Sequence, residues 1–311
     1  MDKSVRQRHL ISIIMATHSE SADLLLKAIL SIQKQTYSNL ELIIVNDGNN
    51  NIDQALQSVS LPQLIVVNNE GVGLVDALNT GLARATGNFI ARMDADDISL
   101  PDRLEKSLKF LEEFDLDFVA TDINYIDLND TITKFGNFRT LIGVELKNIL
   151  KKTNIMNHPT WLIKKEVFLK NGGYLHFYKN EDWNFVLRAI DNGFKLGFLG
   201  EPLLNYRVGP NKITTSKGLY HSNFTFTNLK LNWVKGAIRE YSPEKDDDSF
   251  ALIKKNVIVK RERFISFIFR NVTQTKVSIK VENLLDYWTY VYCYNALITK
   301  IALRRIIKHD K

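Results

Sequence analysis

The sequence has very little cysteine, a single Cys293 in 311 residues. One cysteine excludes an internal disulfide framework and suits a reducing compartment. Proline is scarce too, at 6 residues, and no stretch rich in proline, glycine or serine marks a linker. We find no internal repeat and no low-complexity tract. With 45% hydrophobic and 24% charged residues, the composition is that of a folded protein rather than a disordered one.

Long hydrophobic runs are also missing. The best candidate, residues 287–299, reaches 13 residues before Lys300, short of the roughly 20 that a transmembrane helix needs. A helix lying at a membrane surface and an ordinary packed helix both fit this pattern. The opening MDKSVRQRHL is charged and unlike a signal peptide. We therefore expect a cytoplasmic protein, with peripheral contact to the inner membrane as an open alternative.

Positive charge is concentrated at the C-terminal end. Residues 251–311 hold 13 Lys and Arg against 4 Asp and Glu, which leaves 28 basic and 31 acidic residues in 1–250. A basic, aromatic segment fits an anionic membrane surface or an acidic partner, or is simply a solvated helical face. Its basic residues form no recognised nucleic-acid-binding motif, so we expect no nucleic-acid partner.

Apolar runs alternate with helical periodicity along the first half of the chain. Buried strands are predicted at 10–18, 40–48, 63–69, 88–94 and 117–127. Because these runs lack in–out alternation, we expect an α/β fold with a doubly wound, mostly parallel sheet covered on both faces. Later elements are a helix at 143–152, a strand in MNHPTWLI (156–163), a strand at 194–199 and a separate edge segment at 201–209.

Three carboxylates, Asp94, Asp96 and Asp97, follow the strand at 88–94. Ligands of doubly wound sheets bind beyond the carboxyl ends of the strands, where polar residues also end the first two strands. Closely spaced carboxylates can hold a hard divalent cation, which in turn binds a diphosphate. The alternative is a solvated loop in which Asp97 or Ser99 caps the following helix.

Six segments resemble, in order, the family-2 glycosyltransferases. They are ISIIMATHSE, AILSIQKQTYSNLELIIVNDG, NEGVGLVDALNTGLARATGNFIARMDADDISLPDRL, NHPTWLIKKEVFLKNGGY, NEDWNFVLRA and PLLNYRV. Together they cover roughly residues 9–215, and the combination is specific although no single segment is. The resemblance implies a GT-A fold, an inverting reaction and a Mn²⁺ or Mg²⁺ cofactor.

The resemblance implies a nucleotide pocket made of Ala16, Thr17, His18, Asn46, Asp47, Asn79, Arg92 and Asp94. Asp47 matches the carboxylate that reads the base, and Asn46 replaces the acid that usually precedes it; plain turn chemistry is the alternative for this pair. Asp96 would bind the metal together with Asp94, which would also contact the ribose. Asn79 lies in a helix beside the nucleotide, where a structural role is the alternative.

The resemblance also implies a catalytic base, Asp182, with Glu181 and Trp183 contacting the acceptor. The alternatives are helix-start acids facing the positive dipole end and a core tryptophan. His158 and Arg207 would lie near the donor sugar and phosphates, and a core histidine is the alternative for the first. Gly209 replaces a histidine of many relatives, so the third metal contact is in question and Arg207 or Lys212 could offset phosphate charge instead.

We therefore expect a GT-A domain at 1–217, with a nucleotide-binding half at 9–127 and an acceptor half at 128–217, and a helical, basic extension at 218–311. The expected reaction moves a sugar from a nucleoside diphosphate, UDP as the common case, to a glycan or lipid-linked acceptor in surface polysaccharide or lipopolysaccharide biosynthesis. The alternatives are a nucleotidylyltransferase, whose Gly-rich basic signature is missing, and a non-catalytic membrane- or glycan-binding protein. Such a binder would not need Asp94, Asp96 and Asp182 together.

Overall fold

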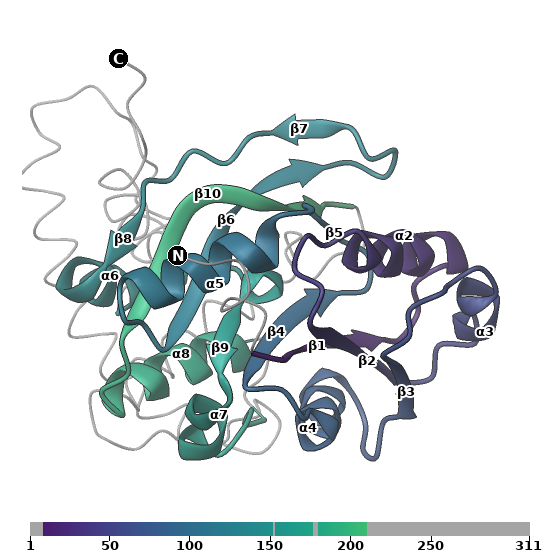
Figure 1. Ribbon diagram of the computed structural model, residues 1–311, viewed down its shortest axis with the longest axis horizontal. Helices are drawn as coiled ribbons and strands as arrows, with labels where there is room; N and C mark the ends of the chain where they lie inside the picture. The colour runs from purple at the N-terminus through teal and green to yellow at the C-terminus, as the bar shows by residue number, and fades with distance from the viewer. Residues whose placement is uncertain (1–8, 152, 177–179, 210–311) are drawn as a thin grey trace, which may run out of the picture. The chain divides into compact units, whose positions relative to one another are not determined.

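The computed structural model describes residues 9–151, 153–176 and 180–209 (Figure 1). The described residues belong to two compact units. Residues 9–175 and 185–209 lie in the first, and the short piece 176–184 belongs to the second. The expected domain boundary at 217, the basic extension at 218–311 and the candidate membrane-surface helix lie outside the described residues. Within the described part, no helix is long and apolar enough to cross a bilayer.

The order of elements confirms the expected alternation of strands and helices. The strands are β1 (Ile11–Thr17), β2 (Leu40–Asn46), β3 (Leu64–Asn68), β4 (Phe89–Asp94), β5 (Ile98–Ser99), β6 (Phe118–Ile126), β7 (Ile132–Lys134), β8 (Leu141–Ile142), β9 (Leu162–Lys164) and β10 (Leu196–Arg207). The helices are α2 (Ala22–Gln33), α3 (Ile52–Leu56), α4 (Leu74–Arg84), α5 (Arg103–Glu113), α6 (Gly143–Leu150), α7 (Lys165–Asn171) and α8 (Glu181–Asp191), with a 3₁₀ turn, η1 (His158–Thr160).

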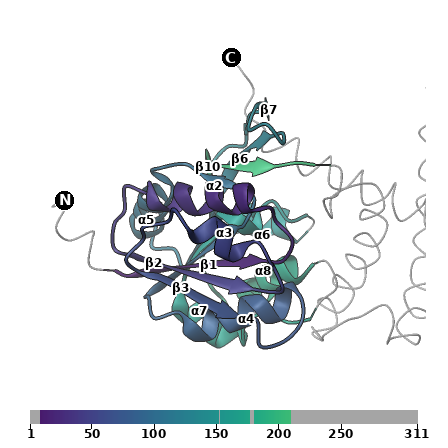
Figure 2. The same cartoon turned by 90° about the vertical axis from the view of Figure 1, so that its right-hand side faces the viewer.

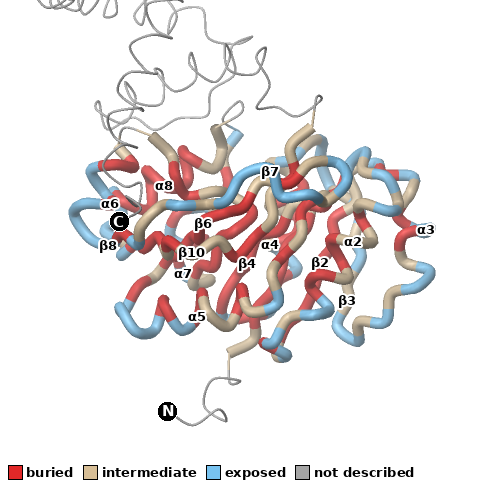
Figure 3. The backbone as a smooth tube through the Cα atoms, turned by 90° about the horizontal axis from the view of Figure 1, so that it is seen from above, coloured by how far each residue is buried: buried red, intermediate tan, exposed pale blue. Residues whose placement is uncertain are grey.

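The described strands form one mixed, mostly parallel sheet, with the order β3-β2-β1-β4-β9-β6-β10-β5. Strands β3, β2, β1 and β4 are parallel neighbours, and β6 is parallel to β10. Between these two parallel parts lies β9, antiparallel to both β4 and β6. Strands β4 and β6 run through the buried middle of the described chain (Figure 3).

Both faces of the parallel part are covered, as the unbroken apolar runs predicted. On one face, Ile11, Ile13 and Met15 of β1 join buried residues of α2 and α5 in one core cluster. On the other face lies α4, and Figure 2 shows α2 and α4 on opposite sides of β1–β3. Gly81 allows the close approach of α4, because a Cβ there would stand 2.5 Å from Cγ2 of Ile14.

Two predicted strands differ from the structure. The segment MNHPTWLI is not one strand: it forms the 3₁₀ turn η1 and then β9, since Pro159 lacks the N–H that a ladder needs. The predicted strand at 194–199 and edge segment at 201–209 are one continuous strand, β10, inside the sheet between β6 and β5. The register shifts on both sides of Pro202, and such bulges are where a proline is tolerated within a sheet.

A buried carboxylate, Glu41, joins the amino-terminal ends of β1 and β2. Its Oε1 accepts hydrogen bonds from the Ser12 hydroxyl and from the backbone N and Oγ1 of Thr86, the latter two at 2.7 and 2.9 Å. Ser12 Oγ in turn accepts from Gly87 N at 2.8 Å. Burial raises the pKa of Glu41, but these hydrogen bonds outweigh it and lower the pKa below its usual value.

We expect Glu41→Ala to destabilise the fold by about 2 kcal/mol, because it leaves the Ser12 hydroxyl and the Thr86 N–H without their acceptor. Chemical denaturation monitored by tryptophan fluorescence measures this change. The control is Glu113→Ala at the exposed end of α5, which should stay within about 0.5 kcal/mol of wild type. Equal stability of the two variants would contradict the structural role of Glu41.

Candidate active site

The register of the sheet brings three polar strand ends together. Thr17 of β1 lies opposite Asn46 of β2, and Ala16 lies opposite Asp94 of β4. Because these strands are parallel, their carboxyl ends share one edge of the sheet. The predicted convergence at this edge is therefore present, and Ala16 is the one partly exposed residue of β1.

The three acids form a compact cluster at the end of β4. Asp94 is the last residue of the strand, and Asp96 and Asp97 lie in the turn that leads to β5. Each offers a carboxylate oxygen, and these oxygens all lie within 4.8 Å of one another. An all-oxygen set of this size fits a hard divalent cation such as Mg²⁺ or Mn²⁺.

Arg92 pairs with the first of these acids. Its side chain is buried, with 4% of the residue exposed, and its guanidinium forms an ion pair with Asp94. Burial lowers the pKa of Arg92, but the charge and hydrogen bond of Asp94, together with the charges of Tyr174 and Asp97, outweigh it and raise the pKa above its ordinary value. Arg92 therefore stays charged and fixes the orientation of Asp94, and its expected contact with the nucleotide remains a prediction.

Asp97 differs from its two neighbours because it is fully buried. It does not cap the next helix: α5 begins after Asp102, whose side chain makes no capping bond. Instead, Asp97 Oδ1 accepts a hydrogen bond of 2.8 Å from the backbone N of Arg207. Ser99 is not a cap either, and its Oγ accepts a bond of 2.7 Å from Nε of buried Arg103. Neither predicted cap is therefore a helix cap: Asp97 bonds β10, and Ser99 bonds the side chain of Arg103.

Tyr206 shows how strongly the cluster acts on its surroundings. The residue lies on β10, one position before Arg207. Burial raises the pKa of its phenol, and the charges of Asp94, Asp97 and Asp96 raise it further. The phenol is therefore neutral and keeps its proton throughout the neutral range.

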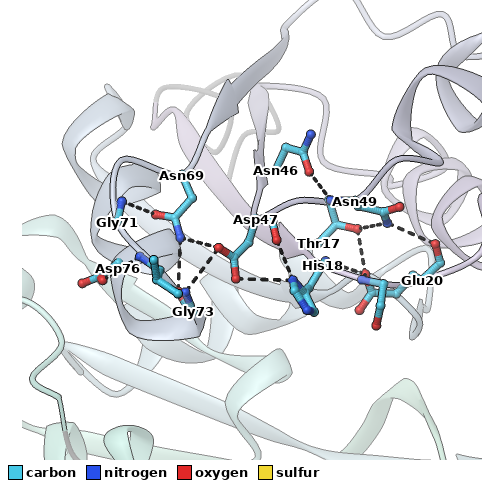
Figure 4. A network of polar contacts seen from close by, with 12 residues as sticks. Thr17, His18, Glu20, Asn46, Asp47, Asn49, Asn69, Gly71, Gly73 and Asp76 are labelled. Carbon is cyan, nitrogen blue, oxygen red and sulfur yellow. Dashed lines mark hydrogen bonds and ion pairs between the residues drawn. The ribbon is translucent and has the colours of Figure 1, made fainter.

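The end of β1 carries a network of short polar contacts (Figure 4). Thr17 Oγ1 donates to Glu20 Oε2 at 2.7 Å and accepts from Asn49 Nδ2 at 2.6 Å. His18 N donates to the same Glu20 oxygen at 2.8 Å, and His18 Nδ1 lies 2.5 Å from the carbonyl oxygen of Asp47. Glu20 and Asn49 were not predicted from the sequence, where NDGNN indicated only a turn.

Asp47 is held by groups from the next strand and helix. Its Oδ1 accepts from Asn69 Nδ2 at 2.7 Å and from Gly73 N at 3.2 Å (Figure 4). The other carboxylate oxygen, Oδ2, faces His18 Nδ1 at 3.7 Å. Asn46 does not duplicate this role, since its Oδ1 accepts from Asn49 N at 2.6 Å and closes the turn. Asn46 therefore stabilises the turn, whereas Asp47 is a carboxylate held in a fixed orientation.

His158 and Asn79 are both in contact with Tyr174. Nε2 of His158 lies 2.8 Å from the Tyr174 hydroxyl, and its ring packs edge-on against buried Trp161. Burial, helped by the charge of Arg92, holds the pKa of His158 well below its usual value. The Asn79 side chain donates from Nδ2 to the Tyr174 carbonyl oxygen at 2.9 Å and accepts at Oδ1 from Tyr174 N at 3.0 Å. These contacts favour the packing alternatives, and donor contact by either residue remains a prediction.

The second acidic pair begins helix α8. Glu181 and Asp182 lie in its first turn, and Asp182 Oδ1 accepts from the backbone N of Trp183 at 2.6 Å. Trp183 is 6% exposed, as the core alternative expects. These residues belong to the second compact unit, whereas α8 from Phe185 onward belongs to the first. Their assigned roles remain predictions.

Arg207 is buried, with 1% of the residue exposed. Besides its backbone bond to Asp97, its Nε donates to the carbonyl oxygen of Asp96 at 2.7 Å. It therefore lies next to the acid cluster, but its guanidinium is bound to protein groups, and its expected contact with the donor phosphates remains a prediction. Gly209 offers only backbone atoms, and Lys212 lies outside the described residues.

Comparison with known proteins agrees with this geometry. A family model described as glycosyl transferase family 2 matches residues 12–172. The O-antigen biosynthesis glycosyltransferase WbnJ of Escherichia coli is 34% identical over 224 residues, covering 70% of this chain and 86% of WbnJ. The UDP-Gal:alpha-D-GlcNAc-diphosphoundecaprenol beta-1,3-galactosyltransferase of Escherichia coli is 28% identical over 223 residues, 68% of this chain and 78% of that protein.

Solved structures show the same fold. TarS of S. aureus, as residues 1–349 in complex with UDP-GlcNAc, superposes with a TM-score of 0.58 at 16% identity, covering 94% of this chain and 89% of that 1–349 chain. At this identity the likeness concerns the fold, which is the expected GT-A arrangement. Given the extent of the family match and the identity to WbnJ, the chain belongs to glycosyl transferase family 2.

Proposed function

We propose that this glycosyltransferase transfers a sugar, with inversion, from a UDP-sugar to a hydroxyl of a glycan or lipid-linked acceptor during surface-polysaccharide biosynthesis. The names of the relatives support the acceptor class, since one makes O-antigen and another acts on a diphosphoundecaprenol-linked sugar. The bound UDP-GlcNAc of TarS supports a UDP-sugar donor. A location at the inner membrane follows from a lipid-linked acceptor and belongs to the same proposal.

One observation carries the proposal, namely the acid cluster at the edge shared by β1, β2 and β4. Asp96 and Asp94 would hold Mn²⁺ or Mg²⁺, which supplies positive charge for the departing diphosphate. Asp97 is fully buried and accepts a hydrogen bond from Arg207 N, so it would anchor the acid turn to β10 rather than bind the metal.

The nucleotide would lie along the same edge. Asp47 is suited to accept a hydrogen bond from the base, because Asn69 and Gly73 fix its Oδ1 and leave Oδ2 toward His18. The Thr17 hydroxyl is held by hydrogen bonds to Glu20 and Asn49. Thr17 would therefore form a fixed part of the pocket wall. Preorganised polar groups of this kind bind without paying to order the site.

Asp182 would act as general base. The acceptor O–H bond breaks and its proton passes to the Asp182 carboxylate, while the acceptor oxygen forms a bond to the anomeric carbon. The bond from that carbon to the diphosphate oxygen breaks, and its electron pair leaves with UDP. Attack opposite the leaving group inverts the anomeric centre. Because Asp182 lies in the first turn of α8, the helix holds its carboxylate in a fixed position, as a general base requires.

A donor screen tests the proposal. We expect UDP release from at least one UDP-sugar in the presence of Mn²⁺, including slow hydrolysis without acceptor, and loss of release with EDTA. Nucleoside triphosphates with sugar phosphates serve as the control, because a nucleotidylyltransferase would release pyrophosphate instead. Absence of metal-dependent release from every nucleotide sugar would contradict the proposed function.

A further inference from the structure

Arg207 links the acid turn to the last described strand through two bonds. Its backbone N donates to Oδ1 of Asp97 at 2.8 Å, and its Nε donates to the carbonyl oxygen of Asp96 at 2.7 Å. The first bond fixes the side chain of Asp97, and the second fixes the peptide group between Asp96 and Asp97. Arg207 therefore fixes where the turn stands relative to β10.

The other end of the guanidinium is held by the turn between β6 and β7. Nη1 donates to the carbonyl oxygen of Asp127 at 2.8 Å, and Nη2 lies 2.5 Å from Oδ1 of Asp130. The turn is itself well built, since Asp127 Oδ1 accepts from the backbone N of Asn129 and of Thr131 at 2.8 and 2.9 Å. The charge of buried Arg207 is thus neutralised within the protein.

Asp130 extends the connection to helix α2. Its Oδ2 lies 3.0 Å from Nζ of Lys27, and its other oxygen faces Arg207. Burial raises the pKa of Asp130, but the bonds from Lys27 and Arg207 outweigh it and lower the pKa below its usual value. The carboxylate is therefore ionised at neutral pH and bridges two cations from α2 and β10.

We propose that Arg207, Asp130 and Lys27 are positioning residues that hold the acid turn in its metal-binding geometry. The inference rests on the proposed function and changes the expected role of Arg207, which would act through Asp96 and Asp97 rather than on the donor phosphates. The guanidinium belongs to a residue that is 1% exposed; its Nε and Nη1 donate to backbone carbonyls and its Nη2 lies 2.5 Å from Asp130, so it presents no face to a ligand. None of Lys27, Asp127 and Asp130 lies in a segment assigned to ligand binding.

The chain offers a matched pair of variants for a test. Asp130 and Asp115 both adopt positive φ, +65° and +48°, where asparagine is tolerated as well as aspartate. Both form ion pairs with lysine, Asp130 with Lys27 and Asp115 with Lys195. Asp130→Asn therefore removes the charge that holds Arg207, and Asp115→Asn removes an equivalent charge on an unrelated exposed turn.

The measurement is the affinity for UDP by isothermal titration calorimetry, with excess Mn²⁺ and again with EDTA. The dissociation constant in EDTA divided by the one with Mn²⁺ reports how much the metal strengthens UDP binding. For Asp130→Asn we expect this ratio to fall about 5- to 10-fold. The acid turn would shift, and its carboxylates would then bind the metal less well. The affinity in EDTA should stay within about twofold of wild type, and Asp115→Asn should match wild type in both conditions.

Arg207→Lys separates the positioning role from direct phosphate contact. A lysine keeps the charge but lacks the planar fork that reaches several acceptors, so the metal-linked ratio should fall while the EDTA affinity holds. If the EDTA affinity falls instead, Arg207 contacts phosphate and the inference is wrong. An unchanged ratio in a folded Asp130→Asn protein also overturns it. A wild-type protein without any metal-linked affinity would instead overturn the metal part of the proposed function.

Discussion

Asp96→Ala should lower metal-dependent UDP release by about 100- to 1,000-fold, the usual cost of removing one electrostatic contact to a developing charge. The variant should stay folded, because the bond from Arg207 Nε goes to the backbone carbonyl of residue 96 and survives the substitution. Steady-state assays with saturating donor, run across a Mn²⁺ titration, measure the effect.

The matched control for this variant is Asp102→Ala. Asp102 lies at the start of α5 and pairs only at the surface with Lys106, four residues on, so its loss should change the rate by less than about twofold. Retention of metal-dependent release in Asp96→Ala would remove the acid cluster from the reaction, and with it the main support for the proposed donor site.

Asp182→Asn should lower transfer by about 100- to 10,000-fold, since asparagine cannot take the acceptor proton. The substitution keeps the shape of the side chain, and an amide oxygen can still accept the bond from Trp183 N. The affinity for UDP with Mn²⁺ should therefore remain within about twofold of wild type. Transfer assays and calorimetry on the same preparation separate the two quantities.

Asp191→Asn, at the exposed last position of the same helix, is the control. It should leave both transfer and UDP affinity unchanged. If Asp182→Asn lost UDP affinity as fully as it lost transfer, Asp182 would be part of the donor site. If it kept full transfer, another group would have to be the base.

The sheet and its functional edge were predictable because local sequence patterns encode them. Three of the predicted parallel strands are apolar runs that end in polar residues, so Thr17, Asp47 and Asp94 could be assigned to one edge. These features depend on residues that are neighbours along the chain.

The remaining features depend on contacts between distant parts of the chain. The bond from Arg207 to Asp96 spans 111 residues, and no periodicity signals such a pairing. The antiparallel strand β9 is only three residues long, too short to show a pattern. The segments 194–199 and 201–209 were expected to be separate, but the bulge at Pro202 that lets them form one strand depends on the register with β6.

The Glu41 cluster and the three acids lie at opposite ends of the same strands. Ser12 and Thr17 are five positions apart on β1, about 16 Å at the rise of an extended chain. Substitutions so far apart, with no common partner, usually have additive effects. On the proposed function, substitutions that strengthen the Ser12–Glu41 end should therefore raise thermal stability without changing UDP release.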